Sequence, residues 1–240
     1  MADGTPARAA SLRRRHAEDG PTEKEREYLE VIYYLAARNE PVIAARLARW
    51  MGVQPPTVAH VLKHQLEKKG YITRNGRGEI TLTPDGFTLA EAVVRRHRIL
   101  ERFLVDVMGI PWHLIHEEAV RLEHALSPTL EARIEALVGH ATTCPHGNPI
   151  PGMCDTYPGD VCLDAAQVGA VFTLQRIVEE AEEDSALMRY LQTNGLVPGA
   201  RFAVTDTSSA YGVTLQAGNQ SITLSPEIAG VLWGEVDARA

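Results

Sequence analysis

Residues 116–124, HEEAVRLEH, are the part of the sequence whose residue types most directly suggest metal chemistry. The segment begins with His-Glu, as the zinc-hydrolase motif H-E-x-x-H does, but Val120 stands where that motif has its second histidine. On a helix, His116 and His124 lie two turns apart, about 12 Å along the axis, so their imidazoles cannot share one ion. A zinc hydrolase with both histidines on one ion is therefore excluded. The two histidines can still serve two separate ions, each completed by another helix.

Two other pairs of polar residues have a spacing suited to metal binding. His97 and Glu101 are four residues apart on a predicted long helix, and His97 falls on its apolar stripe, where an imidazole needs a polar partner. Glu27 and Glu30 are three residues apart on the first predicted helix. Each pair also has a simpler interpretation, as a buried histidine with one hydrogen bond or as solvated carboxylates. Taken separately, these pairs do not establish a metal site.

The overall composition predicts a folded protein outside the membrane. The chain has 240 residues, of which 45% are hydrophobic, and no apolar run approaches the ~20 residues of a membrane helix. Residues 1–21 contain arginines but no apolar segment, which predicts a mobile basic tail rather than a secretory signal. The three cysteines, an odd number, lie close together at Cys144, Cys154 and Cys162. They favour reduced thiols in a cytoplasm over a disulfide framework.

The net charge of −7 is unevenly distributed along the chain. Residues 41–78 contain seven basic side chains against one acidic side chain, whereas residues 155–240 contain twelve acidic side chains against four basic ones. A basic module joined to an acidic one is compatible with DNA binding by the first module alone. The negative total charge therefore does not exclude DNA binding.

Residues 22–83 have the element order of a winged helix-turn-helix domain. Thr22 and Glu25 form a capping-box pattern at the start of the first predicted helix, and two further helices are predicted at 43–50 and 55–66. An alternating segment on each side of the turn at 74–78 predicts a β-hairpin wing. Helix, short helix, glycine turn, helix and hairpin is the order of this DNA-binding motif. The alternative is a three-helix domain with a basic solvated face.

The winged helix-turn-helix hypothesis assigns separate roles to two groups of side chains. The start of the third helix is expected to reach base edges, and basic side chains are expected to contact phosphates. The base-reading candidates are Gln54, Pro56, Thr57 and His60, and the phosphate-contacting candidates are Arg46, Arg49, Lys63, Lys68, Arg74 and Arg77. The phosphate contacts supply affinity and salt dependence with little sequence information.

The rest of the chain is expected to form a helical domain, a linker and a small β-barrel. A long helix at 84–108 and helices at 112–126 and 127–138 predict a helical dimerisation domain over residues 84–143. The segment 144–164 is rich in Pro, Gly and Cys and predicts a linker. Residues 165–240 are expected to form a helical stretch at 165–195 and strands at 201–205, 212–216, 221–224 and 231–236. The fold class is mainly α with small β parts.

Five segments together resemble the diphtheria toxin repressor (DtxR/MntR) family of metal-dependent regulators. They are EREYLEVIYYL (25–35), QPPTVAHVLKHQLEKKGYI (54–72), LTPDGFTLAEAVVRRHRILERFL (82–104), HEEAVRLEH (116–124) and CPHGNPIPG (144–152). The match runs over about residues 22–155, and the C-terminal part is similar to the SH3-like (FeoA-like) domain of many such repressors. The resemblance implies a homodimer that binds Mn(II) or Fe(II) as co-repressor and then binds palindromic operator DNA.

The resemblance also implies two metal sites, which it assigns residue by residue. One site maps to His97, Glu101 and His116, and the other to Glu27, Glu123, His124 and position 120. Relatives place a ligand at position 120, where this chain has Val120; Glu30 matches a further carboxylate of manganese-responsive members. Ligands from the SH3-like domain are expected near Glu183, Asp184 and Leu187, where at most a carboxylate is available.

The ligand types favour Mn(II), or Fe(II), over thiophilic ions, because every candidate is a carboxylate or an imidazole. Zinc or cadmium binding in vitro would not contradict this preference, since affinity alone favours later divalent ions. Cys144 and His146, with Cys154 and Cys162, resemble a zinc site, but the segment is interpreted as a structural linker. The sequence therefore predicts a cytoplasmic, dimeric, metal-dependent transcriptional regulator rather than an enzyme. The alternative is a metal-independent DNA-binding or interaction protein.

Overall fold

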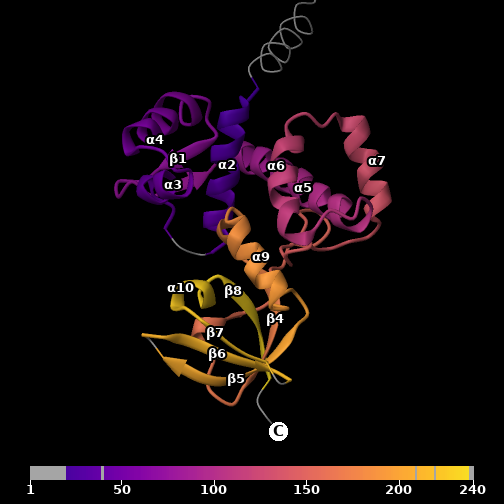
Figure 1. The fold of residues 1–240 in the computed structure, drawn as a ribbon. Helices are drawn as coiled ribbons and strands as arrows, with labels where there is room; N and C mark the ends of the chain where they lie inside the picture. The colour runs from indigo at the N-terminus through magenta and orange to yellow at the C-terminus, as the bar shows by residue number, and fades with distance from the viewer. Residues whose placement is uncertain (1–19, 39–40, 209, 219, 238–240) are drawn as a thin grey trace, which may run out of the picture. The chain divides into compact units, whose positions relative to one another are not determined.

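The computed structural model describes residues 20–38, 41–208, 210–218 and 220–237 (Figure 1). The predicted basic tail lies almost wholly outside these residues. The chain divides between Ala90 and Glu91 into two compact units, each of which is described by itself. Within the described residues, no helix is long and apolar enough to cross a membrane.

The first unit contains the predicted helices and hairpin. Its elements are α2 (Glu23–Ala36), α3 (Ala44–Trp50), α4 (Pro55–Val61), β1 (Ile72–Arg74), β2 (Ile80–Leu82) and the first turns of α5 (Pro84–Asp106). Thr22 and Glu25 form the predicted capping box, with the Thr22 hydroxyl accepting from the Glu25 backbone N–H. Helix α4 continues into a π-helical segment, η1 (Leu62–Leu66), so the two together form one rod. The strands β1 and β2 pair antiparallel as the wing.

The core of the first unit is formed by apolar residues at the spacings that the sequence predicts. Leu29, Ile32 and Leu35 of α2 are completely buried and pack with Leu47 of α3 and Leu62 of η1. Because helices α3 and α4 are only seven residues each, this shared core rather than intrinsic helix propensity holds them in place.

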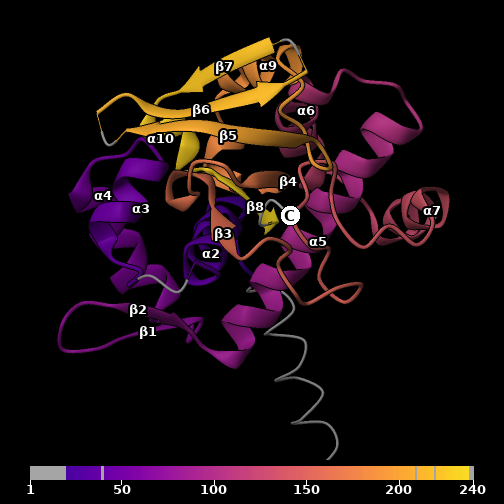
Figure 2. The same cartoon turned by 90° about the horizontal axis from the view of Figure 1, so that it is seen from below.

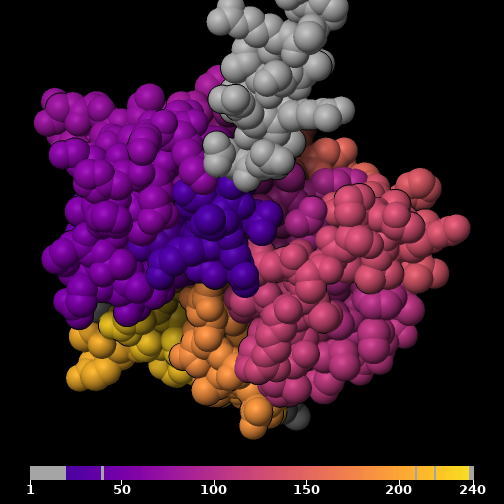
Figure 3. Space-filling view, turned by 90° about the horizontal axis from the view of Figure 1, so that it is seen from above, coloured from indigo at the N-terminus to yellow at the C-terminus, as the bar shows by residue number. Residues whose placement is uncertain are grey.

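The second unit begins with a helical region. It contains the rest of α5, η2 (Trp112–Leu114), α6 (Ile115–Glu123) and α7 (Pro128–Val138). Leu100, Leu104 and Ile115 form its core together with Ile134 of α7. Apolar side chains also remain exposed on this region, namely Val107, Leu122, Leu130 and Leu137. Figure 3 shows the outer surface of these helices in magenta and rose.

An antiparallel sheet forms the remainder of the second unit. Its strands are β3 (Val161–Cys162), β4 (Val171–Ile177), β5 (Arg201–Ser208), β6 (Gly212–Ala217), β7 (Gln220–Leu224) and β8 (Leu232–Asp237), in the order β3-β8-β4-β5-β6-β7. Figure 2 shows β5, β6 and β7 side by side, as their pairing requires. The short helices are α8 (Glu179–Glu182), α9 (Ser185–Thr193), α10 (Pro226–Ala229) and the 3-10 turn η3 (Leu163–Ala165).

Two expectations about residues 144–195 are wrong. The predicted helical stretch at 165–195 contains strand β4, because the sequence VFTLQRI alternates Phe172, Leu174 and Arg176 inward with half-buried residues between them. The sheet also begins at Val161, inside the segment predicted as a linker, since Val161 and Cys162 pair with Gly234 and Trp233 of β8. Only α8 and α9 are helical in the stretch.

A buried arginine joins the helical region of the second unit to its sheet. The guanidinium of Arg98, on α5, donates to the Pro149 carbonyl and to the Glu179 carboxylate at the start of α8. The Tyr157 hydroxyl accepts a further bond from Arg98 at 3.2 Å, and the guanidinium groups of Arg98 and Arg176 lie 5.7 and 5.1 Å from the centre of the Tyr157 ring. This network holds α5, the linker and α8 at fixed distances from one another.

Candidate metal centre

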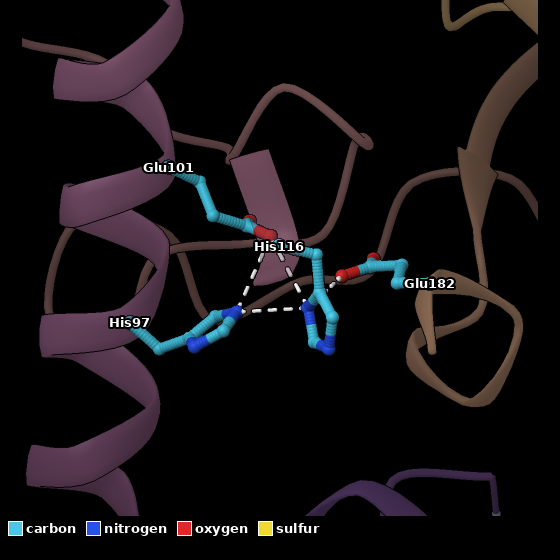
Figure 4. A group of neighbouring side chains, drawn as sticks. All are labelled: His97, Glu101, His116 and Glu182. Carbon is cyan, nitrogen blue, oxygen red and sulfur yellow. Dashed lines mark hydrogen bonds and ion pairs between the residues drawn. The ribbon is translucent and has the colours of Figure 1, made fainter. Parts of the chain in front are cut away.

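Four buried polar residues meet where α5, α6 and α8 converge (Figure 4). His97 and Glu101 come from α5, His116 from the first turn of α6, and Glu182 from the last residue of α8. One donor atom from each residue lies within 4.8 Å of the others. A group of two imidazoles and two carboxylates in a common buried space is the kind of ligand set that divalent transition ions take.

The donor atoms are close enough to face one centre. The Nε2 atom of His97 lies 3.2 Å from Oε1 of Glu101 and 3.1 Å from Nδ1 of His116. The same His116 nitrogen lies 3.5 Å from Glu101 Oε1 and 3.3 Å from Glu182 Oε2. The structure therefore brings together the three residues that the family resemblance assigns to one site, and adds Glu182.

Glu182 corrects the expected contribution of the sheet domain. The expectation pointed to Glu183, Asp184 and Leu187, but Asp184 caps α9 by accepting from the Ala186 and Leu187 backbone N–H groups. The Glu183 carboxylate lies 3.7 Å from Nε2 of His116 and is largely exposed. The sequence could not identify Glu182 because β4 was not recognised, and the register of α8 depends on where that strand ends.

Glu123 contacts His97 as well as His124. The prediction placed it only in the site with His124. Its Oε2 atom is 2.7 Å from Nδ1 of His97, and its Oε1 atom is 3.3 Å from Nε2 of His124. Because a carboxylate oxygen accepts, Nδ1 of His97 donates its proton to Glu123, and an ion that displaces the proton on Nε2 would meet a lone pair facing Glu101 and His116. Glu123 thereby orients a histidine of the centre.

Two residues of the predicted linker also reach the centre. The Nδ1 atom of His146 lies 3.2 Å from Glu101 Oε1 and 3.2 Å from Glu182 Oε2, and its ring meets Trp112 edge to face. Cys144, Glu101 and His146 form a second group with donor atoms within 4.8 Å of one another. The interpretation of this segment as only structural is therefore incomplete. The Cys-x-His spacing at 144–146 was the available signal.

The protonation of the histidines is governed by the surrounding carboxylates. Burial alone would lower the pKa of His97, but Glu101 and Glu123 outweigh it and raise the pKa to about 10. Burial also opposes the charged forms of His116 and His146, yet Glu101 and Glu182 hold the pKa of each well above its usual value. Conversely, burial would raise the pKa of Glu101, but His146 and His97 keep it well below the usual range.

The thiol of Cys144 differs from the other donors. Burial, followed by the charge of Glu101, raises the pKa of Cys144 to about 12, so the side chain is a neutral thiol at pH 7. A neutral thiol is a weak ligand for Mn(II) or Fe(II), whereas a thiophilic ion that displaces its proton would bind it strongly. Mn(II) or Fe(II) would therefore bind the oxygen and nitrogen donors of the centre, whereas only a thiophilic ion would also bind the Cys144 sulfur.

The donor arrangement fits a bound divalent cation. Glu101 is completely buried, and among the described residues its Oε2 atom has no hydrogen-bond partner. The raised pKa values leave His97 and His116 protonated in the metal-free protein, where their facing nitrogens, 3.1 Å apart, repel each other. A cation among these atoms would satisfy both conditions.

A pocket of about 400 Å³ opens beside the centre. It is lined by His113, His116, Glu117, Val120, Arg121, Glu182, Glu183 and Ser185. Val120 is 42% exposed and lies beside His116 on this pocket rather than in the core. The pocket therefore gives solvent access to the edge of the centre at His116 and Glu182.

The remaining predicted ligands lie in the first unit. Glu27 and Glu30 are on α2, where Glu27 is half-buried and the Glu30 carboxylate accepts a 2.7 Å hydrogen bond from the Tyr34 hydroxyl. Their assignment to a site with Glu123 and His124 remains a prediction.

The predicted DNA-contacting residues lie on the first unit's surface. Gln54 precedes α4, and the side chains of Pro56, Thr57, His60 and Lys63 are exposed along the rod formed by α4 and η1. Arg49, Lys68 and Arg77 are exposed and Arg46 is half-buried. Arg74 is engaged, because its guanidinium donates to both oxygens of Glu67 at 2.6 and 2.8 Å.

Three family models match the chain. The N-terminal DNA-binding domain of iron-dependent repressors matches residues 22–79, their metal-binding and dimerisation domain matches residues 83–152, and the FeoA domain matches residues 161–236.

Individual relatives match over most of their length. The iron-dependent repressor IdeR of Mycobacterium tuberculosis (strain H37Rv) is 35% identical over 214 residues, which cover 84% of this chain and 92% of the relative. A manganese-dependent transcriptional repressor solved in complex with manganese is 32% identical with a TM-score of 0.75, covering 87% of this chain and 98% of that one. The structure of IdeR from T. acidophilum is 28% identical with a TM-score of 0.72, covering 89% and 98%. The chain therefore belongs to the iron-dependent (diphtheria toxin) repressor family of metal-dependent, DNA-binding transcriptional regulators.

Proposed function

We propose that this protein is a homodimeric repressor in the cytoplasm that binds palindromic operator DNA when Mn(II) or Fe(II) is bound. The buried group of His97, Glu101, His116 and Glu182 is the observation that carries this proposal. Manganese and iron are favoured because the four donors are imidazoles and carboxylates. The relatives solved or named with manganese and iron support the same choice.

Each residue of the centre has a separate part in the proposed mechanism. His97, Glu101, His116 and Glu182 would hold the ion, and Glu123 orients the His97 ring by accepting from Nδ1. The bound ion would supply positive charge among carboxylates that the protein otherwise neutralises with protonated histidines. Glu182 comes from the sheet domain and the other three from α5 and α6, so the ligand set ties these elements together.

A second ion is proposed on Glu123 and His124 with Glu27 and Glu30 of the first helix. This proposal rests on the family resemblance. The second site has one side-chain ligand fewer than in relatives, because Val120 stands where they have a ligand. Metal at such a site would fix α2, which precedes the helix-turn-helix, and so set the spacing of two recognition helices to half-sites about one DNA turn apart. Metal affinity and DNA affinity must then rise together.

The exposed apolar side chains of the helical region support the proposed homodimer. Each of four side chains is more than 40% exposed: Val107 in the turn after α5, Leu122 on α6, and Leu130 and Leu137 on α7. A partner subunit would remove this apolar surface from water.

A DNA-binding titration tests the proposed function. Fluorescence anisotropy of a labelled operator is measured at fixed salt with Mn(II), with Fe(II) under anaerobic conditions, and with chelator. We expect metal to raise operator affinity, and the variant His116→Ala to lose the increase while keeping its helical circular dichroism. An operator affinity that is the same with metal and with chelator would instead favour a metal-independent DNA-binding protein.

A further inference from the structure

The side-chain amide of Asn148 lies between two acceptors at the edge of the metal centre. Asn148 is completely buried, and its Nδ2 atom donates to the Ile177 carbonyl at 2.7 Å and to Oε1 of Glu182 at 2.9 Å. Both protons of the amide nitrogen are therefore used. The first bond reaches the last residue of β4, and the second reaches the last residue of α8.

The two acceptors determine the orientation of this amide. A carbonyl oxygen and a carboxylate oxygen can only accept from it, so the side chain must present nitrogen rather than oxygen to both. The opposite atom, Oδ1, has no hydrogen-bond partner among the described residues. A rotated amide would place Oδ1 against two acceptors, which excludes that orientation.

The backbone around Asn148 is fixed as tightly as its side chain. The Cys144 N–H donates to the Asn148 carbonyl at 2.8 Å, and the Gly147 N–H donates to the Cys144 carbonyl at 3.0 Å. The Ile177 N–H donates to the His146 carbonyl at 2.9 Å, so the turn lies directly against the end of β4. These backbone hydrogen bonds therefore hold Asn148 in place with its side chain directed at Glu182.

The bond from Asn148 gives the two oxygens of the Glu182 carboxylate different partners. Oε1 faces Asn148, while Oε2 lies 3.3 Å from Nδ1 of His116 and 3.2 Å from Nδ1 of His146. While this bond is kept, the carboxylate presents Oε2 to an ion, and a rotation that turned both oxygens toward the ion would break the bond.

We propose that Asn148 is a positioning residue that holds Glu182 as a one-oxygen ligand and so sets the affinity of the centre. This inference rests on the proposed function, because it assumes that Glu182 binds the ion. It assigns the linker turn at 144–148 a role in metal binding through Glu182, separate from the contacts of Cys144 and His146.

A double-mutant cycle on metal affinity tests the proposal. Mn(II) affinity is measured by competition with a chelating fluorophore for the native chain, Asn148→Ala, Glu182→Ala and the double variant. We expect Asn148→Ala to weaken Mn(II) binding by about 10- to 100-fold in the native background, as removal of an outer ligand partner does. In the Glu182→Ala background the same change should cost less than about threefold, because the group it acts through is gone.

A matched control separates positioning from loss of the turn. Arg102→Gln removes the hydrogen bonds that the Arg102 guanidinium donates to the Thr143 carbonyl at 2.7 Å and the Cys144 carbonyl at 3.2 Å, at the start of the same turn, without touching Glu182. This variant should bind Mn(II) within about threefold of the native chain and keep its Mn(II) electron paramagnetic resonance spectrum. Asn148→Ala should change that spectrum, since a freed carboxylate offers the ion both oxygens.

Two results would overturn the inference. An equal loss of affinity from Asn148→Ala in both backgrounds, or an equal loss from Arg102→Gln, would mean that Asn148 only supports the fold. A native chain that binds no Mn(II) would be recognised before any variant is compared, and it would remove the proposed function together with this inference.

Discussion

The carboxylate of Glu123 and the ring of His97 are joined by a 2.7 Å contact from Oε2 to Nδ1, on the side of the imidazole away from Glu101. Glu123 belongs to the helix α6 and His97 to α5, so the contact connects two elements 26 residues apart in the chain. A histidine whose Nδ1 proton is held by a carboxylate is a stronger metal ligand through Nε2. Glu123 therefore acts on the centre through His97.

Replacement of Glu123 by glutamine is expected to weaken Mn(II) binding by about 10- to 100-fold, because the amide no longer fixes the His97 tautomer. Isothermal titration with Mn(II) measures the change. Glu118→Gln is the matched control, since Glu118 is on the same helix and accepts a hydrogen bond from Arg121 on the surface. Unchanged affinity in Glu123→Gln would contradict the orienting role.

Gly147→Ala is expected to destabilise the second unit. A Cβ at this position would lie 2.0 Å from the Gln175 carbonyl oxygen and 2.8 Å from the Arg176 Cα, so the turn would have to leave β4. Overpacking of this kind costs about 1–3 kcal/mol, in addition to the strain of a non-glycine residue at φ +92°. Thermal unfolding monitored by circular dichroism measures the loss.

Gly109→Ala is the control for this prediction. Gly109 also has a positive φ, +67°, but nothing lies within 4 Å of its would-be Cβ. Its replacement should therefore carry only the backbone strain and lower the melting temperature by less. An equal decrease in both variants would mean that the contact with β4 contributes nothing.

Metal binding is expected to release protons at pH 7. The pKa of His97 is raised to about 10, and those of His116 and His146 are also raised, so metal-free protein carries protons that an ion must displace. Mn(II) affinity should rise with pH from 6 to 8. Calorimetric titrations in buffers of different ionisation enthalpy count the released protons, and a count of zero would contradict the prediction.

The same shift predicts how the stability of metal-free protein changes with pH. A His97 pKa above its unfolded value of about 6.5 stabilises the fold fully below that value. The contribution is lost as the pH rises toward about 10. Chemical unfolding in chelator at pH 6, 8 and 9.5 should therefore show decreasing stability from this group, and His97→Gln should reduce the slope.

Glu67→Gln is expected to strengthen DNA binding without changing sequence preference. The Glu67 carboxylate accepts two hydrogen bonds from Arg74, and this pairing raises the pKa of Arg74 and lowers that of Glu67. Without this carboxylate, Arg74 is free to contact a phosphate, which adds about one unit to the salt dependence of binding. Anisotropy titrations at several salt concentrations on operator and random DNA measure the change, with Arg74→Ala as the control that should have the opposite effect.

Local patterns in the sequence determined much of this protein. The capping box at Thr22, the apolar spacing of α2 to α5 and the turn before Glu79 specify the winged helix-turn-helix by short-range rules. The i, i+4 spacing of His97 and Glu101 places these two residues one above the other on a helix, and the family resemblance then assigned them to one metal site.

Only the tertiary structure decided which other residues join them. Glu182 and His146 lie 81 and 45 positions beyond Glu101 along the chain, and they reach it because β4 ends at Ile177 and the 144–148 turn docks there. The family resemblance assigned Glu123 to a site with His124, yet its second oxygen meets His97 across a helix packing contact. Contacts of this range depend on how elements pack, which periodicity within one element cannot encode.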